Sequence, residues 1–423
     1  MLLPSPRILS AAATYDWRVG RDWCAVESYL RRFIMADQRG LLASSSGASA
    51  TLDEVAHMGV IGGEFTSKNE RYTGKSCRKT FAVEMGYVGF LFKGWQKQSA
   101  SSEQQQSAVE DEVRRLLRDS QVAGAGSLTV AGRTDKGVSA CSQVFSFTTT
   151  SSQTEDEILS SLRASLASAK IDGLAVYDVR RVPKSFNARS SATWRRYLYL
   201  LPLRDDGGDA SLDVQRLSGL LSALQRRGEL PFDAFSFGEL NDCGQGRRDR
   251  CTLLQTSVGF VDLLAPGSAS ASASASASAS ASSTDPAAMA GVRQSPEGMQ
   301  QPALRIELVG NRFLRRMVRI LLATAVLEAS SSPSSSSSPS PSPSSAERGQ
   351  DEALVDICLS GDRRLAAYPL PGTGLCFAGV GFDAPSLAFY KFQPAADAKR
   401  ARELLLLDAP PPTSLVTTSS PSE

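Results

Sequence analysis

The side chain best suited to chemistry is the carboxylate of Asp135, in the segment 131–140 with the sequence AGRTDKGVSA. Apolar runs at 128–131 and 144–147 flank this segment. Glycines and charged residues between two apolar runs predict a loop that joins two strands. A carboxylate held in such a loop can act as a nucleophile or as a general base. Taken alone, a Thr-Asp pair more often only caps a turn, so other residues must decide between the two interpretations.

Several cations could act together with this carboxylate. Arg133 lies two residues before Asp135, so an extended backbone would place both side chains on one side, where the arginine would keep the acid ionised. A second group follows an i, i+3, i+4, i+7 spacing, which predicts one basic face on a helix over 312–327: Arg312, Arg315, Arg316 and Arg319. On its own, such a run is more often a solvated surface than a binding site.

Acid–base chemistry in this chain must rest on residues other than histidine. The single histidine, His57, lies in a poorly patterned stretch, which argues against Ser-His-Asp or Cys-His chemistry. The seven cysteines are scattered without a Cys-x-x-Cys pair, so we expect no zinc site and no disulfide framework. Tyr197 is a candidate in the strand-like run 197–200, although it could be a packed core residue, as we expect for Tyr199.

The bulk composition indicates a globular protein. The chain has 423 residues, of which 42% are hydrophobic, and a formal net charge of +2. This charge is too small for a global basic field, so a nucleic-acid surface would have to come from local clusters. No apolar run reaches the length that spans a membrane. We therefore expect an intracellular soluble protein, with nucleus, cytosol and organelle all open.

The elements that position these residues follow one order twice. Strand-like and helix-like periods alternate as β-α-β-β-α-β, the ferredoxin-like unit, first over about 79–179 and again over about 197–382. We predict an α+β fold with two ferredoxin-like halves. They would form one continuous antiparallel sheet with helices on one face, leaving the open face for RNA.

The remaining segments have no sustained period. Residues 1–75 form an unassigned N-terminal extension, and 76–200 and 201–392 form the two halves. An Ala-Ser repeat and a Ser/Pro run predict disordered inserts at about 266–300 and 329–350. Residues 393–423 should form a loose tail.

Four ordered segments resemble motifs of the TruA family of tRNA pseudouridine synthases. The Asp135 loop is similar to the family's Gly-Arg-Thr-Asp followed by Gly-Val. Segment 313–319 is similar to Phe-Leu-x-x-Met-Val-Arg, and 186–199 to Phe-x-Ala-Arg…Arg-x-Tyr-x-Tyr. Segment 87–98 is similar to Tyr-x-Gly…Gly-Trp-Gln-x-Gln.

The sequence departs from the bacterial pattern at three places. Val88 stands where bacterial members commonly carry an acid, and Lys136 where they carry a small residue, so the chain is more similar to the eukaryotic branch. The family's Ala-Pro-Ala is missing before Gly374-Leu375.

The resemblance implies the pseudouridine synthase fold and isomerisation of tRNA uridines in or near the anticodon arm, without metal or cofactor. It implies that Asp135 is the catalytic aspartate, attacking C1′ or removing the C2′ proton, with Arg133 and Arg319 as its cations. Tyr197 would stack on the flipped uracil and take the C5 proton. The substrate-binding residues that it implies are Gly94, Trp95, Gln96, Gln98, Asn187, Arg189, Arg195, Arg196, Arg312, Arg315 and Arg316.

Two other classes of function stay open at this point. One is a catalytically idle RNA-binding protein on the same scaffold, and the other is a structural protein whose Ser-rich loops recruit partners. An idle scaffold has no chemical need for both Asp135 and Tyr197, so we favour the enzyme. The motifs leave open which uridines are modified and whether the protein is a monomer or a homodimer.

Overall fold

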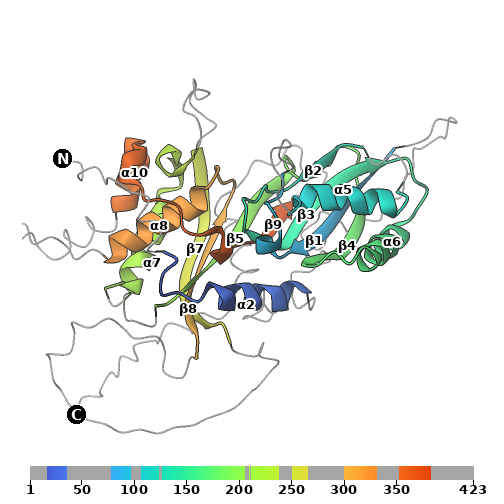
Figure 1. Ribbon diagram of the computed structural model, residues 1–423. Coiled ribbons are helices and arrows are strands. Elements are labelled where there is room, and N and C mark those ends of the chain that lie inside the picture. The colour runs from blue at the N-terminus through green and yellow to red at the C-terminus, as the bar shows by residue number, and fades with distance from the viewer. Residues whose placement is uncertain are drawn as a thin grey trace, which may run out of the picture.

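A computed structural model gives the structure of the chain and describes residues 17–35, 78–96, 106–122, 126–204, 209, 211–237, 250–264, 300–330 and 352–382. These residues form an α+β fold around a nine-stranded sheet (Figure 1). The expected inserts at about 266–300 and 329–350 fall almost entirely outside the described residues, and the expected tail at 393–423 does so completely.

The first half of the sheet has the strand order β4-β1-β3, with β2 paired to β3, and all of these pairs are antiparallel. Phe81, Val83 and Met85, whose alternation predicts the first strand, are buried in the core of β1. The elements of this half are β1 (Lys79–Tyr87), α5 (Val109–Asp119), β2 (Leu128–Val130), β3 (Ser139–Thr149), α6 (Glu155–Ser168) and β4 (Leu174–Val182).

The second half has the strand order β9-β5-β8-β7-β6, again with antiparallel pairs. Its elements are β5 (Ala192–Pro202), α7 (Val214–Arg227), β6 (Glu229–Pro231), β7 (Arg250–Asp262), β8 (Pro302–Gly310), α8 (Met317–Ser330), α10 (Ala353–Ser360) and β9 (Leu375–Phe382). Helices α5 to α10 of the two halves share one continuous core with alternate strand residues such as Tyr197, Tyr199 and Leu201.

The two halves meet where β3 lies beside β9. Ser139 is paired with Cys376 and Ala140 with Phe377, and this pairing is parallel. The prediction of an antiparallel sheet is therefore wrong at this junction, and the sheet is mixed. The direction of β9 is set by its long antiparallel pairing with β5, which leaves it parallel to β3.

Helix α2 (Trp23–Met35) covers the opposite face of the sheet and is drawn below β1, β3 and β4 in Figure 1. It packs against Leu198 and Leu200 of β5 and against Cys376 of β9. The Tyr177 hydroxyl donates to the Ile34 carbonyl at 2.9 Å, which ties α2 to the first half as well. Its buried side chains are Ala25, Val26, Tyr29, Leu30, Phe33 and Ile34.

The expectation of helices on one face only, with the other face open to RNA, is therefore wrong where α2 lies. The buried residues of α2 recur at i, i+4 and i+8, the spacing of an amphipathic helix, so an apolar stripe was present in the stretch that we left unassigned. The stripe is short, and the surrounding residues, rich in Ser and Gly, show no sustained period that would indicate a helix. No helix among the described residues is long and apolar enough to cross a membrane.

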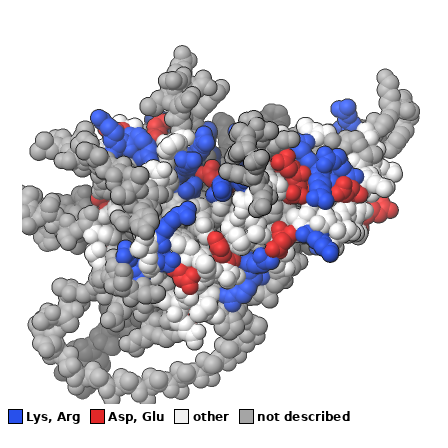
Figure 2. All heavy atoms as spheres, viewed as in Figure 1, with Lys and Arg blue, Asp and Glu red and all other residues white. Residues whose placement is uncertain are grey.

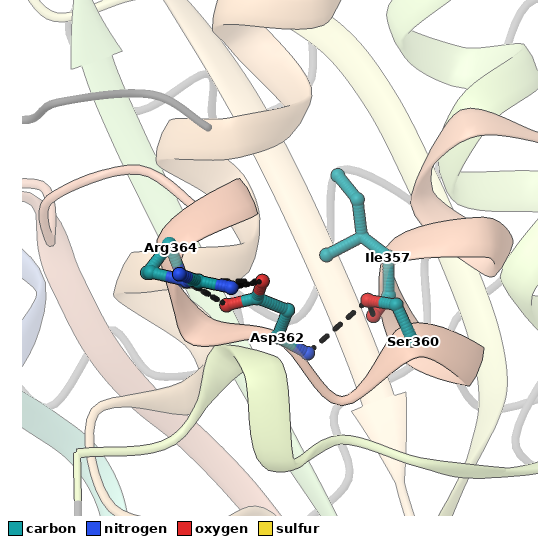
Figure 3. Close-up of polar contacts among 4 residues, drawn as sticks. All are labelled: Ile357, Ser360, Asp362 and Arg364. Atoms are coloured by element: carbon teal, nitrogen blue, oxygen red, sulfur yellow. Dashed lines mark hydrogen bonds and ion pairs between the residues drawn. The ribbon is translucent and has the colours of Figure 1, made fainter. Parts of the chain in front are cut away.

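Polar contacts among residues 357–364 fix the turn that follows α10 (Figure 3). The Ser360 hydroxyl donates to the Ile357 carbonyl at 2.8 Å and accepts the Asp362 amide at 3.1 Å. Gly361 has a φ of 64°, which glycine adopts at helix C-termini without strain. Asp362 then pairs with Arg364 at 2.7 Å, and this pairing lowers the pKa of Asp362 to about 2. The chain leaves this turn toward Leu370, which lies beside the first turn of α8.

Candidate active site

The loop between β2 and β3 holds Asp135 in a tight turn. The Val138 amide donates to the Asp135 carbonyl at 3.2 Å, and Gly137 has a φ of 82°, in the left-handed region that favours glycine. At the start of the loop, the Ala131 amide donates to the Val144 carbonyl at 2.9 Å. The Asp135 side chain keeps an exposed fraction of 33%. The backbone is thus held while the carboxylate stays open to a substrate.

A buried hydrogen-bond network fixes the loop from below. The hydroxyls of Tyr87 and Thr134 are 2.7 Å apart, and the Gln143 amide donates to the Gly132 carbonyl at 2.7 Å and to the Tyr87 hydroxyl at 3.3 Å. Burial raises the pKa of Tyr87, so its hydroxyl stays protonated and able to donate. The patterns in the sequence do not predict this network. The one residue that could have indicated it is Gln143, a polar side chain directly before the apolar run 144–147.

The segment around Gly94 supports the loop from the side. Gly94 has a φ of 98°, and a Cβ atom there would lie 2.8 Å from the Thr134 carbonyl oxygen. The Trp95 amide donates to that same oxygen at 3.0 Å, and the Trp95 ring is buried beside Tyr87. Gly94 and Trp95 thus shape the loop from within the protein. Gln96 is exposed, whereas Gln98 lies outside the described residues.

Arg319 reaches Asp135 from the other half of the sheet. Its Nη1 lies 3.3 Å from Asp135 Oδ2, and its Nε donates to the Leu370 carbonyl at 2.6 Å. The Leu370 amide donates in return to the Arg319 carbonyl at 3.1 Å. Burial lowers the pKa of Arg319, and the Asp135 carboxylate opposes that shift. The guanidinium is therefore fixed in place and charged beside the acid.

The other arginines of this region do not share a helical face. Strand β8 ends at Gly310 and α8 begins at Met317, so the prediction of a helix from Arg312 is wrong over its first five residues. The Asn311 side chain accepts the Thr252 amide at 2.9 Å, and Arg316 has a φ of 59°, which an α-helix cannot contain. Arg312 and Arg315 are exposed and Arg316 is half-buried, all in the turn before α8.

Tyr197 lies on β5 at the base of the site. Its ring is buried, with Phe313 and Phe377 packed edge-on at centroid distances of 5.0 and 5.2 Å. Burial raises the pKa of Tyr197 most, Arg195 opposes that rise, and the charge of Asp135 adds to it. Phe377 also lies against Gly132 at the start of the Asp135 loop, so a single side chain separates the Tyr197 ring from that loop. Tyr199, two residues on, donates its hydroxyl to the Pro371 carbonyl at 3.0 Å, as a core residue.

Arg195 holds the loops around the site together. Its guanidinium donates to the carbonyls of Ala131 at 3.1 Å, Asn311 at 2.9 Å and Arg189 at 2.7 Å. One side chain thus links the Asp135 loop, the turn before α8 and the turn before β5. Asn187 organises that last turn, since its side chain accepts the Arg189 amide at 3.0 Å. Both residues therefore serve first to shape the loops.

Arg196 points to the opposite face of the sheet from Tyr197. It is buried and pairs with Glu307 at 2.9 Å, and Glu307 is also paired with Arg305. This arrangement differs from the phosphate contact that we expected, because neighbouring strand residues point to opposite faces. Arg195 is on the site face and Arg196 is not.

The exposed arginines that could bind a polyanion near the site lie on loops around Asp135. Arg133 on the Asp135 loop, Arg189 and Arg312 are exposed. Burial lowers the pKa of Arg195 most, and the charges of Arg312 and Arg189 add to that shift. Elsewhere both signs are interspersed on the face drawn in Figure 2. On α5, for example, Arg114 is paired with Glu110 at 2.8 Å. No group of three or more His, Cys, Asp or Glu residues in the described part of the chain is arranged to hold a metal ion.

Comparison with known proteins gives a consistent set of relatives for part of the chain. No protein-family model matches it. Over 125 residues it is 38% identical to tRNA pseudouridine synthase A of Neisseria meningitidis, a match that covers 29% of this chain and 43% of that protein. The protein of the same name from Streptomyces avermitilis is 35% identical over 130 residues, which cover 31% of this chain and 45% of that protein. The one from Chlorobium limicola is 37% identical over 123 residues, which cover 29% of this chain and 47% of that protein.

The matched segment spans a little less than half the length of these curated relatives. Over that segment the chain is a homologue of proteins named tRNA pseudouridine synthase A, so the resemblance to the TruA family is confirmed there.

Proposed function

We propose that this homologue of the tRNA pseudouridine synthase A proteins is itself a tRNA pseudouridine synthase, an isomerase that acts on a flipped uridine through Asp135. The observation that carries the proposal is the pairing of Asp135 with Arg319 beside the buried Tyr197. An acid, a fixed cation and a protonated phenol from three elements together cover the roles that the reaction needs.

The reaction breaks the C1′–N1 bond of uridine, turns the uracil over and joins C1′ to C5. Asp135 can attack C1′ or remove the C2′ proton, and both routes require an ionised carboxylate. Arg319 favours that ionised form and holds the carboxylate in one orientation. Neither route calls on a group beyond those of the chain and the substrate.

Tyr197 would bind the uracil during this turn. Its ring would supply the stacking surface, and the two phenylalanine rings set nearly at right angles to it hold it in place. Since the hydroxyl stays protonated in the buried site, its oxygen can take the C5 proton only as its own proton leaves. Asp135, again a free carboxylate once C1′ is bonded to C5, would accept this phenol proton, and N1 of the turned uracil would take up a proton in turn.

The tRNA would be held by the exposed cations of the loops. Arg133, Arg189, Arg312 and Arg315 offer phosphate contacts, and Gln96 offers an amide to a base or ribose. We place the target uridine in the anticodon arm, from the family resemblance. The strand orders β4-β1-β3 with β2 on β3, and β9-β5-β8-β7, support two ferredoxin-like halves in a pseudouridine synthase fold.

Tritium release tests this proposal. Isomerisation at C5 exchanges the C5 hydrogen with water, so tRNA transcripts labelled with [5-³H]uridine should lose tritium in the presence of the full chain. The Asp135→Asn variant should bind the same tRNA and release none. Equal release by both proteins would contradict the role of Asp135, and no release by either, despite binding, would indicate an idle RNA-binding scaffold.

A further inference from the structure

An exposed aromatic ring lies beside the candidate site with a cation on one of its faces. Phe237 follows the short 3₁₀ turn Asp233–Phe235 and has an exposed fraction of 43%. The guanidinium carbon of Arg316 lies 4.5 Å from the centre of its ring. The Phe237 amide donates to the Arg315 carbonyl at 3.1 Å, which fixes the backbone of the pair. Arg316 thus covers one side of the ring in a residue that is otherwise partly open to solvent.

The arginine of this pair is held in an unfavourable state. Its φ of 59° is uncommon for a residue with a Cβ atom. Its Nε is shielded from solvent and finds no hydrogen-bond acceptor among the described residues. Both features cost stability, and such residues concentrate at functional sites. The Phe237 ring is the partner that the structure does supply.

The pair is coupled to the catalytic group through α8. The Arg316 carbonyl accepts the Ile320 amide at 3.1 Å, so Arg316 directly precedes α8, the helix that carries Arg319. Arg319 lies in the first turn of that helix, three residues after Arg316. Burial lowers the pKa of Arg319 most, and the charge of Arg316 adds to that shift. Arg319 in turn contacts Asp135. The ring of Phe237 is therefore placed at the edge of the site rather than at a remote surface.

We propose that Phe237 and Arg316 form a stacking platform for one unpaired nucleobase of the RNA, that of a nucleotide next to the target uridine. This inference rests on the proposed function. A base offers a flat π-face whatever its identity, and exposed aromatic rings bind such faces without reading the sequence. The guanidinium on the opposite side of the ring adds a positive charge near the phosphates of that nucleotide. The platform would hold the flanking base out of the stack while the uridine enters the site.

The test measures stacking directly and does not require turnover. The full chain carrying Asp135→Asn is bound to anticodon-arm RNA in which 2-aminopurine replaces the nucleotide on either side of the target uridine. Fluorescence and binding are then compared with those of the same chain carrying in addition Phe237→Ala or Phe237→Tyr. Thermal unfolding of each protein reports any loss of fold.

If a base stacks on Phe237, the Asp135→Asn parent should quench 2-aminopurine at one of the two positions. Phe237→Ala should restore that fluorescence and weaken RNA binding roughly tenfold. Phe237→Tyr should behave like the parent. If alanine leaves quenching and affinity unchanged at both positions, the platform is wrong even where tritium release by the wild type supports the isomerase. If alanine lowers the unfolding temperature and the tyrosine variant binds as weakly as the alanine variant, Phe237 is a structural residue and the platform is also wrong.

Discussion

Arg319 joins the two halves of the molecule at the candidate catalytic acid: its Nη1 lies 3.3 Å from Asp135 Oδ2 while its Nε donates to the Leu370 carbonyl at 2.6 Å. The two residues are separated by 184 positions in the chain. One planar side chain therefore bridges the Asp135 loop of the first half and the segment that precedes β9. Arginine suits this task because its donors are arranged in a rigid fork.

We expect Arg319→Lys to lower the single-turnover rate of tritium release by about 100-fold, because one ammonium cannot hold both partners and the carboxylate would be misplaced. RNA affinity should change by no more than a few-fold, which filter binding measures. Arg315→Lys is the matched control, since Arg315 is an exposed arginine of the same segment and should lose little rate. A lysine variant of Arg319 with near-normal turnover would contradict the positioning role.

Tyr197→Phe should keep the stacking surface and remove the phenol oxygen. If the hydroxyl takes part in proton transfer at C5, product formation should slow by about 100-fold while RNA binding stays intact. Tyr197→Leu should lose both properties. Rapid-quench measurements on stoichiometric enzyme and tRNA separate the steps, and a phenylalanine variant as fast as the wild type would restrict Tyr197 to stacking.

The network under the Asp135 loop can be measured as a coupling between Tyr87 and Thr134. Tyr87→Phe removes a buried hydroxyl from its 2.7 Å contact and should lower the free energy of unfolding by about 1 kcal/mol. Thr134→Val should cost a similar amount, and the double variant should cost less than the sum of the two. Urea unfolding gives all three values. Strict additivity would show that the two hydroxyls do not support one another.

Helix α2 provides a test of the second face of the sheet. Leu30 is 1% exposed, so Leu30→Ala should lower the free energy of unfolding by about 2–5 kcal/mol. Met35 lies on the same helix with an exposed fraction of 41%, and Met35→Ala should cost far less. If both variants unfold at the same denaturant concentration as the wild type, α2 does not pack on the sheet in solution.

Much of the arrangement follows from local patterns in the sequence. The alternation of Phe81, Val83 and Met85 and the stripe of Val109, Val113 and Leu116 predict β1 and α5, since hydrophobic periodicity is a local property of the sequence. The alternation does not show that β1 is buried on both faces, because that depends on the elements packed against it. The Asp135 loop is recognisable because its glycines and charges interrupt two strands. The contact with Arg319 was expected from the resemblance, whereas its geometry depends on Leu370, which no local pattern indicates.

The features that sequence reasoning missed depend on distant partners or on a single residue. The spacing of the arginines predicts that Arg316 lies within a helix. Its φ of 59° is incompatible with an α-helix, so α8 begins only at Met317. The resemblance predicts Arg196 as a substrate-binding residue, but its partner is Glu307, 111 residues further along the chain, and no local pattern indicates that pairing. Tyr87 and Gln143 meet only because β1 and β3 pair, so their hydrogen bond could not be foreseen.

The central claim is that Asp135 makes this protein a uridine isomerase, and pseudouridine mapping tests it most directly. Unmodified tRNA transcripts are incubated with the purified full chain or with its Asp135→Asn variant, treated with carbodiimide and read by primer extension. We predict new stops at discrete uridines with the wild type and none with the variant. Identical stop patterns for both proteins, or tight tRNA binding by the wild type without any new stop, would contradict the claim.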